Sequence, residues 1–119
     1  MLLAGCQQEN TYQYFMTHPK VLQKKLTACE NTAESKECAV VSRAGNDFSK
    51  LADEQLNDSD LFGQQLIKAE EQLFVFSQEY EKAKQTGNED KIKSASQAYQ
   101  DQSDLVQIYK AVLSTRSPN

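Results

Sequence analysis

Tryptophan is absent from the sequence, and residues that interrupt helices are scarce, with four Gly and two Pro among 119 residues. Long apolar runs are missing as well, since no stretch approaches the roughly 18 residues that a transmembrane helix requires. The only histidine is His18, and no Ser-His-acid or Cys-His catalytic arrangement can be assembled around it. Glycine-rich phosphate loops and clusters of metal ligands are also missing. We therefore expect a helical protein that is not an enzyme and that uses no cofactor, metal or small-molecule substrate.

The sequence also has no excess of positive charge. The 13 basic and 17 acidic residues give a formal net charge of -4, and the isoelectric point is about 5.0. Binding to nucleic acid requires basic residues that neutralise phosphates, so we do not expect nucleic acid as a partner. The length of 119 residues and a mean hydropathy of -0.69 indicate one small domain with a thin core.

The first of three cysteines, Cys6, closes the sequence Leu-Ala-Gly-Cys at residues 3–6, which matches the bacterial lipobox. Small residues before the cysteine suit the signal peptidase, and the thiol is then acylated and becomes the new amino terminus. Only two residues precede this pattern, whereas a signal peptide has a basic start and roughly 7–15 apolar residues. We interpret the start as a shortened signal peptide, the alternative being a chance match.

Acylation by two or three chains anchors a protein stably to a membrane. We therefore expect lipidation at Cys6, with the polar residues 7–10 as a tether. The protein would be held in the cell envelope and face the periplasm. Gln7 directly after the cysteine favours the outer membrane over the inner membrane.

Cys29 and Cys38 lie close together and enclose eight residues. In an oxidising compartment two such thiols most simply form a disulfide, which stabilises the fold by about 2.5 kcal/mol for a loop this short. A metal site is the alternative, but the spacing exceeds the gap of about two to four residues in zinc sites, and one histidine is available. We predict a Cys29–Cys38 disulfide.

Residues 11–57 are expected to form a small helical region that the disulfide staples. The side chains of Tyr12, Tyr14 and Phe15 are costly to expose. We expect them to dock on the segments that follow and so to belong to the core. The alternative is that they form part of a surface for a partner.

Two short helices are predicted within this region. Pro19 opens the first, because proline suits the first turn of a helix. The apolar face of this helix consists of Leu22, Leu26 and Cys29. The second helix should run from about residue 33 to residue 44 and end at Gly45-Asn46. Asp47 is then expected to cap the next segment.

Residues 58–115 predict a long antiparallel helical hairpin. Apolar residues step by 3 and 4 along each half, as in the seam of a coiled coil, and Thr86-Gly87-Asn88 separates the halves. The first seam consists of Phe62, Leu66, Ala69, Leu73, Phe76, Tyr80 and Ala83. The second consists of Ile92, Ala95, Tyr99, Gln102, Val106, Tyr109 and Leu113. The fold class is therefore all-α, and residues 116–119 form a tail.

A few residues do not follow the apolar seam. Ile67, Phe74 and Val75 lie off the first seam. We expect them to rest on the amino-terminal helices, the alternative being a surface for a partner. Gln102 is a polar member of the second seam and is expected to fix its register.

The order of several features resembles a known family of small lipoproteins. After the lipobox come an aromatic pair, a polar residue with a proline that opens a helix, and two closely spaced cysteines. The residues that carry this pattern are Tyr14-Phe15, His18-Pro19, Leu22, Leu26, Cys29 and Cys38. Over residues 3–56 the chain thus resembles the EexN-type entry exclusion lipoproteins of conjugative plasmids. The hairpin from residue 58 onward departs from that compact domain.

The resemblance implies a periplasm-facing protein without enzymatic activity that blocks redundant DNA transfer from a like donor. Its implied target is a protein of the donor's type IV secretion channel, recognised by a surface held near the membrane. Cys6 would anchor the chain, and the Cys29–Cys38 pair would hold the recognised surface. The candidate partner-binding residues are Tyr12, Tyr14, Phe15 and Phe74.

Two other functions remain open from the sequence. A structural or docking lipoprotein of the envelope or of a secretion apparatus would use the helical hairpin to hold its partner. A cytoplasmic helical adaptor requires the lipobox to be a chance match. That adaptor would carry free thiols at Cys29 and Cys38 and no lipid at Cys6.

Overall fold

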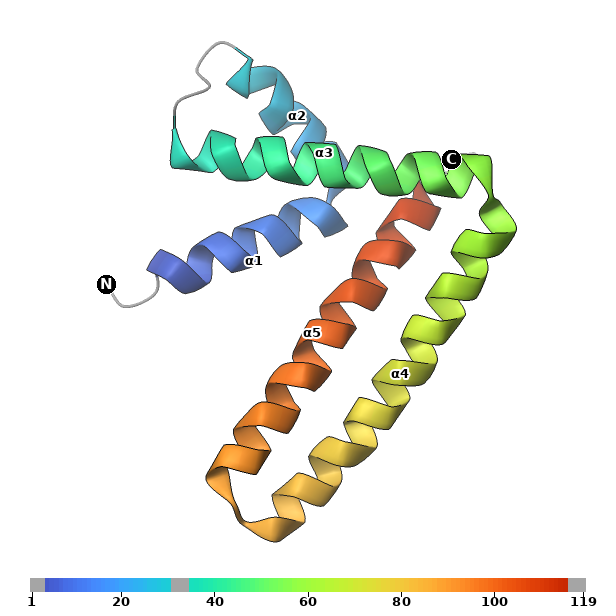
Figure 1. Ribbon diagram of the computed structural model, residues 1–119. Helices are drawn as coiled ribbons and strands as arrows, with labels where there is room; N and C mark the ends of the chain where they lie inside the picture. The colour runs from blue at the N-terminus through green and yellow to red at the C-terminus, as the bar shows by residue number, and fades with distance from the viewer. Residues whose placement is uncertain (1–3, 31–34, 116–119) are drawn as a thin grey trace.

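The computed structural model describes residues 4–30 and 35–115, with side chains from residue 11 onward. This part of the chain forms five helices and no strand (Figure 1), which confirms the all-α prediction. The helices are α1 (Ala4–Thr17), α2 (Pro19–Cys29), α3 (Lys36–Asn57), α4 (Ser59–Thr86) and α5 (Glu89–Ser114).

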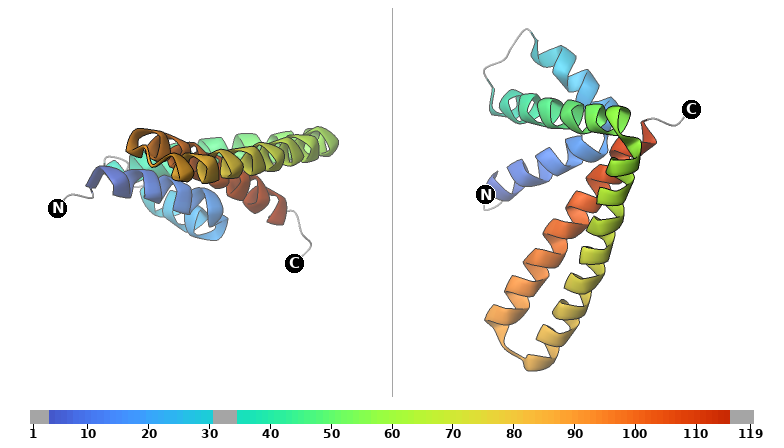
Figure 2. Two further views of the ribbon diagram at one scale, coloured as in Figure 1. Left: turned by 90° about the horizontal axis from the view of Figure 1, so that it is seen from below. Right: turned by 45° about the vertical axis from the view of Figure 1, so that its right-hand side comes forward.

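The helices are arranged as a compact end and a projecting arm. Helices α1, α2 and α3 gather at one end, and the α4–α5 hairpin extends away from them (Figures 1 and 2). The molecule measures 52 × 43 × 20 Å. Because a helix with its side chains is about 10–12 Å wide, the smallest dimension corresponds to two layers of helices. Figure 2 shows this flat shape from below.

Local sequence signals explain where the helices start. The side chains of Ser35, Asp58 and Asn88 each accept a hydrogen bond from the backbone N–H three residues later, at 3.0, 3.0 and 3.1 Å. These bonds satisfy donors that a helix start leaves without a partner. Pro19 occupies the first turn of α2, as predicted. Gly87 adopts φ 69° at the end of α4, a left-handed conformation that glycine accepts at little cost.

The main core lies where α1, α2 and α3 meet the carboxyl-terminal half of α5. Its buried members are Phe15, Met16, Leu22, Val41, Ala44 and Ile108. Ile108 and the fully buried Val112 lie outside the predicted seam of α5. Helix α5 thus has a second apolar face, which attaches the hairpin to the compact end.

The hairpin formed by α4 and α5 packs along the predicted seams. The rings of Phe62 and Tyr109 meet edge to face with centroids 5.1 Å apart. Gln102 donates a hydrogen bond from its Nε2 to the Ala69 carbonyl oxygen at 3.0 Å. A shift of register would separate these two groups and leave a partly buried amide without that acceptor.

The predicted end of the second short helix is wrong, because α3 continues through Gly45 and Asn46 to Asn57. A glycine can end a helix, but it also allows close approach of a neighbour. A Cβ atom at Gly45 would lie 2.9 Å from Leu26 Cδ2, so the missing side chain makes room for α2. Asp47, expected to be a cap, lies inside α3 and binds Tyr12 instead.

The predicted tether at residues 7–10 is also wrong, since α1 begins at Ala4 and includes these residues. The predicted start of the second short helix at about residue 33 and the predicted tail at 116–119 lie outside the described residues. The disulfide-stapled region of the structure therefore comprises α1, α2 and α3, and we call it the stapled region below.

Candidate functional site

The predicted disulfide is present between Cys29, at the end of α2, and Cys38, in the first turn of α3. The two Cα atoms are 5.6 Å apart, within the usual range for a disulfide. Cys38 is buried, at 8% exposure. The bridge therefore fixes the amino-terminal end of α3 against α2.

A second connection joins α1 to α3. The Tyr12 hydroxyl donates a hydrogen bond to Asp47 Oδ2 at 2.5 Å. The Arg43 guanidinium lies over the Tyr12 ring, 4.4 Å from its centroid, in a cation–π contact. Burial, followed by the hydrogen bond to Asp47, raises the pKa of Tyr12 to about 12. Tyr12 thus serves as a structural link rather than as a free surface residue.

Tyr14 and His18 form an exposed stacked pair at the elbow between α1 and α2. Their ring centroids are 3.9 Å apart and their planes meet at 17°. Tyr14 is 47% exposed, so the expectation that it docks on the following segments is wrong. His18 Nδ1 lies 2.8 Å from the Tyr14 carbonyl oxygen and 3.2 Å from Thr17 Oγ1. Stacking and hydrogen bonds together hold the imidazole in one orientation.

The His18 tautomer follows from these contacts. A carbonyl oxygen only accepts hydrogen bonds, so Nδ1 must carry the proton that it shares with Tyr14. In the neutral ring Nε2 is then a hydrogen-bond acceptor. Within the described ranges Nε2 has no partner.

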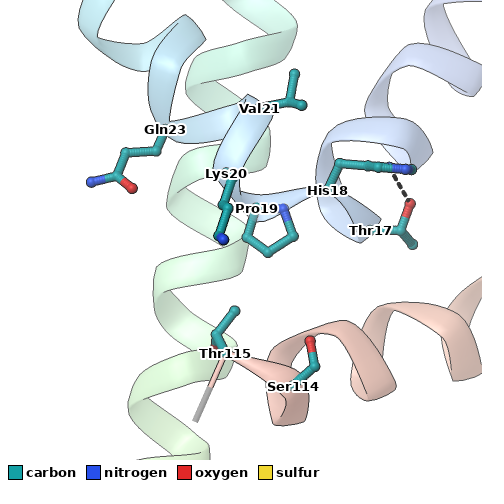
Figure 3. Close-up of a pocket in the computed structure, with 8 residues that line it drawn as sticks. All are labelled: Thr17, His18, Pro19, Lys20, Val21, Gln23, Ser114 and Thr115. Carbon is teal, nitrogen blue, oxygen red and sulfur yellow. Dashed lines mark hydrogen bonds between the residues drawn. The ribbon is translucent and has the colours of Figure 1, made fainter. Parts of the chain in front are cut away.

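An open hollow of about 620 Å³ lies beside this pair (Figure 3). Its walls come from the α1–α2 junction and from the carboxyl-terminal end of α5. The lining residues are Thr17, His18, Pro19, Lys20, Val21, Gln23, Ser114 and Thr115. These residues include one positive charge and no carboxylate.

The outer side of α4 exposes the three apolar residues that lie off its seam. Phe74 is 62% exposed, Ile67 56% and Val75 41%. The expectation that they rest on the amino-terminal helices is therefore wrong, and they form an apolar surface on α4.

The four residues proposed for partner binding do not form one site. Phe15 is 3% exposed and belongs to the core, and Tyr12 is tied to Asp47. Tyr14 and Phe74 are exposed, but they lie on different helices, α1 and α4. Lipidation at Cys6 concerns a side chain outside the described part of the chain.

Sequence reasoning assigned His18 only a role at the helix start and missed its stacking on Tyr14. The structure does place His18 at the N-cap of α2, without a side-chain capping bond. The spacing of four residues between Tyr14 and His18 was an available signal, because side chains four apart on a helix are neighbours.

The described ranges contain neither a cluster of metal ligands nor a membrane-spanning helix. Among those residues, no group of three or more His, Cys, Asp and Glu side chains is placed to hold a metal ion. No helix in the described part of the chain combines the length and apolar character needed to cross a membrane.

No family model, no curated protein and no solved structure matches the chain. Function must therefore be inferred from the residues and contacts described above.

Proposed function

We propose that the chain is a lipid-anchored, periplasm-facing protein of the entry exclusion type, which blocks redundant conjugative DNA transfer by recognising a type IV secretion component of the donor. The observation that carries this proposal is the way in which the EexN-like pattern folds. Its aromatic pair, His-Pro helix start and two cysteines all lie in the stapled region.

Each element of that pattern has a defined place in the stapled region. Phe15 and Leu22 are buried together in the core, and Pro19 begins α2 directly after the elbow. Cys29 and Cys38 then close the α2–α3 connection. This connected arrangement supports the proposal, because the residues of the pattern act together in one unit of the fold.

The disulfide also supports a location outside the cytosol, because cytosolic thiols are usually kept reduced. The lipobox ending at Cys6 supports the same location by an independent route. Together they favour exclusion or an envelope role over a cytoplasmic adaptor.

The proposed mechanism is binding without chemistry. The disulfide and the Tyr12–Asp47 bond hold α1, α2 and α3 in one arrangement, so little conformational freedom is lost on binding. A lipid at Cys6 would confine the protein to the membrane surface and raise its effective concentration near an incoming channel.

Conjugation frequency tests the proposal directly. Deletion of the gene from a recipient should raise uptake from a donor with the cognate secretion system and leave uptake from an unrelated donor unchanged. The wild-type gene should restore exclusion, whereas Cys6→Ser should restore it poorly because the anchor is lost. Unchanged uptake from the cognate donor on deletion would contradict the proposal.

The exposed side of α4 favours a second function, that of a docking lipoprotein of the envelope or of a secretion apparatus. Ile67, Phe74 and Val75 present the apolar face that a partner helix can cover. Substitution of Ile67 and Phe74 by Ser should then impair secretion or envelope integrity and leave DNA uptake unchanged. Normal secretion and envelope integrity in this variant would contradict the docking function.

A further inference from the structure

The outward face of α2 is basic, in contrast to the acidic chain as a whole. Helix α2 contains Lys20, Lys24 and Lys25 and no acidic residue, whereas the net charge of the chain is -4. Lys25 forms an ion pair with Glu37 at 3.4 Å. Lys20 and Lys24 are exposed and have no ion pair within the described ranges.

The two free lysines continue the hollow described above. Residues three and four apart share one face of a helix, so Lys20, Gln23, Lys24 and Thr27 form a polar stripe along α2. All four are exposed. Lys20 and Gln23 also line the hollow. Figure 3 shows Lys20 beside Pro19 on α2, facing Ser114 and Thr115 at the end of α5.

The Tyr14–His18 pair adds a fixed recognition element beside the Lys20 end of this stripe. His18 lines the hollow and is held by stacking on Tyr14. Its Nε2 atom offers an acceptor to an incoming N–H group. Exposed aromatic side chains that are already ordered are favourable anchors for a partner, because little entropy is lost when they bind.

We propose that the Tyr14–His18 pair, the adjoining hollow and the Lys20–Lys24 face of α2 form one docking site for an acidic segment of a partner protein. The segment places an apolar side chain in the hollow, carboxylates near the two lysines and a backbone N–H near His18 Nε2. The identification of this partner with a donor channel protein rests on the proposed function.

Charge and geometry favour a protein segment over an anionic membrane. Membrane attraction through charge generally uses clusters of about four to eight basic residues, and the stripe has two free lysines. A lipid headgroup also makes no use of Pro19 and Val21 in the wall of the hollow or of the stacked His18 ring. The acidic partner is the ligand whose chemistry matches all three parts of the site.

Charge reversal in the full-length chain tests the basic face. Exclusion by a recipient carrying Lys20→Glu with Lys24→Glu should fall about tenfold or more, as expected when central interface contacts are lost. Lys91→Glu with Lys93→Glu makes the same charge change at exposed positions near the hairpin turn and should leave exclusion unchanged. Full exclusion by the α2 variant, with thermal unfolding like that of wild type, would overturn the docking site.

Two substitutions of His18 separate its nitrogen atoms. His18→Asn retains a donor near the position of Nδ1 and removes the acceptor at Nε2, so exclusion should fall. His18→Gln places an amide oxygen near the position of Nε2 and should retain more exclusion than the Asn variant. If both variants exclude DNA as well as wild type does, the His18 imidazole is not part of the docking site.

Binding of purified protein gives a test that does not depend on exclusion. The oxidised, isotope-labelled chain is titrated with a short Asp/Glu peptide that contains one Phe, and separately with vesicles of phosphatidylglycerol. The peptide should shift the amide resonances of residues 14–24 and 114–115, and a peptide with Lys in place of the acidic residues should not.

The outcomes distinguish the two proposals. Peptide shifts confined to those residues support the docking site even if gene deletion does not alter DNA uptake, a result that would contradict the exclusion role alone. Absence of these shifts, or shifts with vesicles only, overturns the docking site and leaves the exclusion role to be judged by conjugation.

Discussion

Removal of the Cys29–Cys38 bridge should weaken the stapled region more than any other part of the chain. The variant Cys29→Ala with Cys38→Ala opens a loop of sequence separation 9. The chain-entropy model gives about 2.5 kcal/mol for a loop of this size. A domain of this size has a free energy of unfolding of roughly 5–15 kcal/mol, so the loss is a substantial part of the total.

The loss should be largest in α2, which has 11 residues. Isolated helices shorter than about 12–15 residues are marginal in water. Without the bridge α2 depends on contacts such as that of the buried Leu22 with the core. Hydrogen exchange should therefore accelerate in α2 more than in the α4–α5 hairpin.

Urea unfolding followed by circular dichroism measures the effect. The double variant should unfold with a free energy about 2.5 kcal/mol below that of oxidised wild type. Reduction of wild type should cause a similar loss and leave the variant unchanged, and Cys6→Ala should resemble wild type. Equal stabilities of the variant and oxidised wild type would refute the role assigned to the bridge.

Three further changes test individual contacts by the same unfolding assay. Gly63→Ala should stabilise the chain by about 1 kcal/mol, because no atom of the described residues lies within 4 Å of the new Cβ. Gly45→Ala should not give this gain, because its Cβ meets Leu26. Equal effects of the two substitutions would contradict the close approach of Leu26 to Gly45. Gln55→Met should stabilise the chain by about 1 kcal/mol, because Gln55 Oε1 is buried and has no hydrogen-bond partner among the described residues. A loss of stability would show that this oxygen accepts a hydrogen bond. Tyr12→Phe should be less stable than wild type below pH 10, and this difference should disappear by about pH 12, because the pKa of Tyr12 is raised from 10.0 to about 12 and its stabilisation is lost as the phenol ionises. A difference that is independent of pH would contradict this link.

The hairpin and the disulfide were predictable because their signals are local. The seam repeats, Gly87 and Asn88 specify two helices and their turn without reference to the rest of the molecule. The close spacing of Cys29 and Cys38 likewise limits how far apart their Cα atoms can lie.

The continuity of α3 was missed because a tertiary contact decides it. Gly45 followed by Asn46 is typical of a helix end, but Leu26 from α2 occupies the space that the glycine leaves. The apolar pattern did indicate a continuous helix, since Ala44, Phe48 and Leu51 form one apolar face that runs across Gly45 and Asn46.

The candidate site could be predicted only in part. Tyr12, Tyr14 and Phe15 are neighbouring aromatic residues that the sequence does not distinguish. Their different roles depend on where α3 and α5 pack against α1. Asp47 lies 35 positions from Tyr12, so no local pattern joins them. The positions of Ser114 and Thr115 beside Pro19 depend in the same way on how the hairpin folds back.

The turn between α4 and α5 offers a practical route to follow this protein in living cells. Gly87 ends α4 and Asn88 caps α5, so an insertion between these two residues leaves both helix ends with their own capping groups. Short insertions at an exposed tip cost little free energy. An epitope tag placed there would lie at the far end of the arm from α2 (Figure 1), where an antibody could report the protein's location while the stapled region stays uncovered.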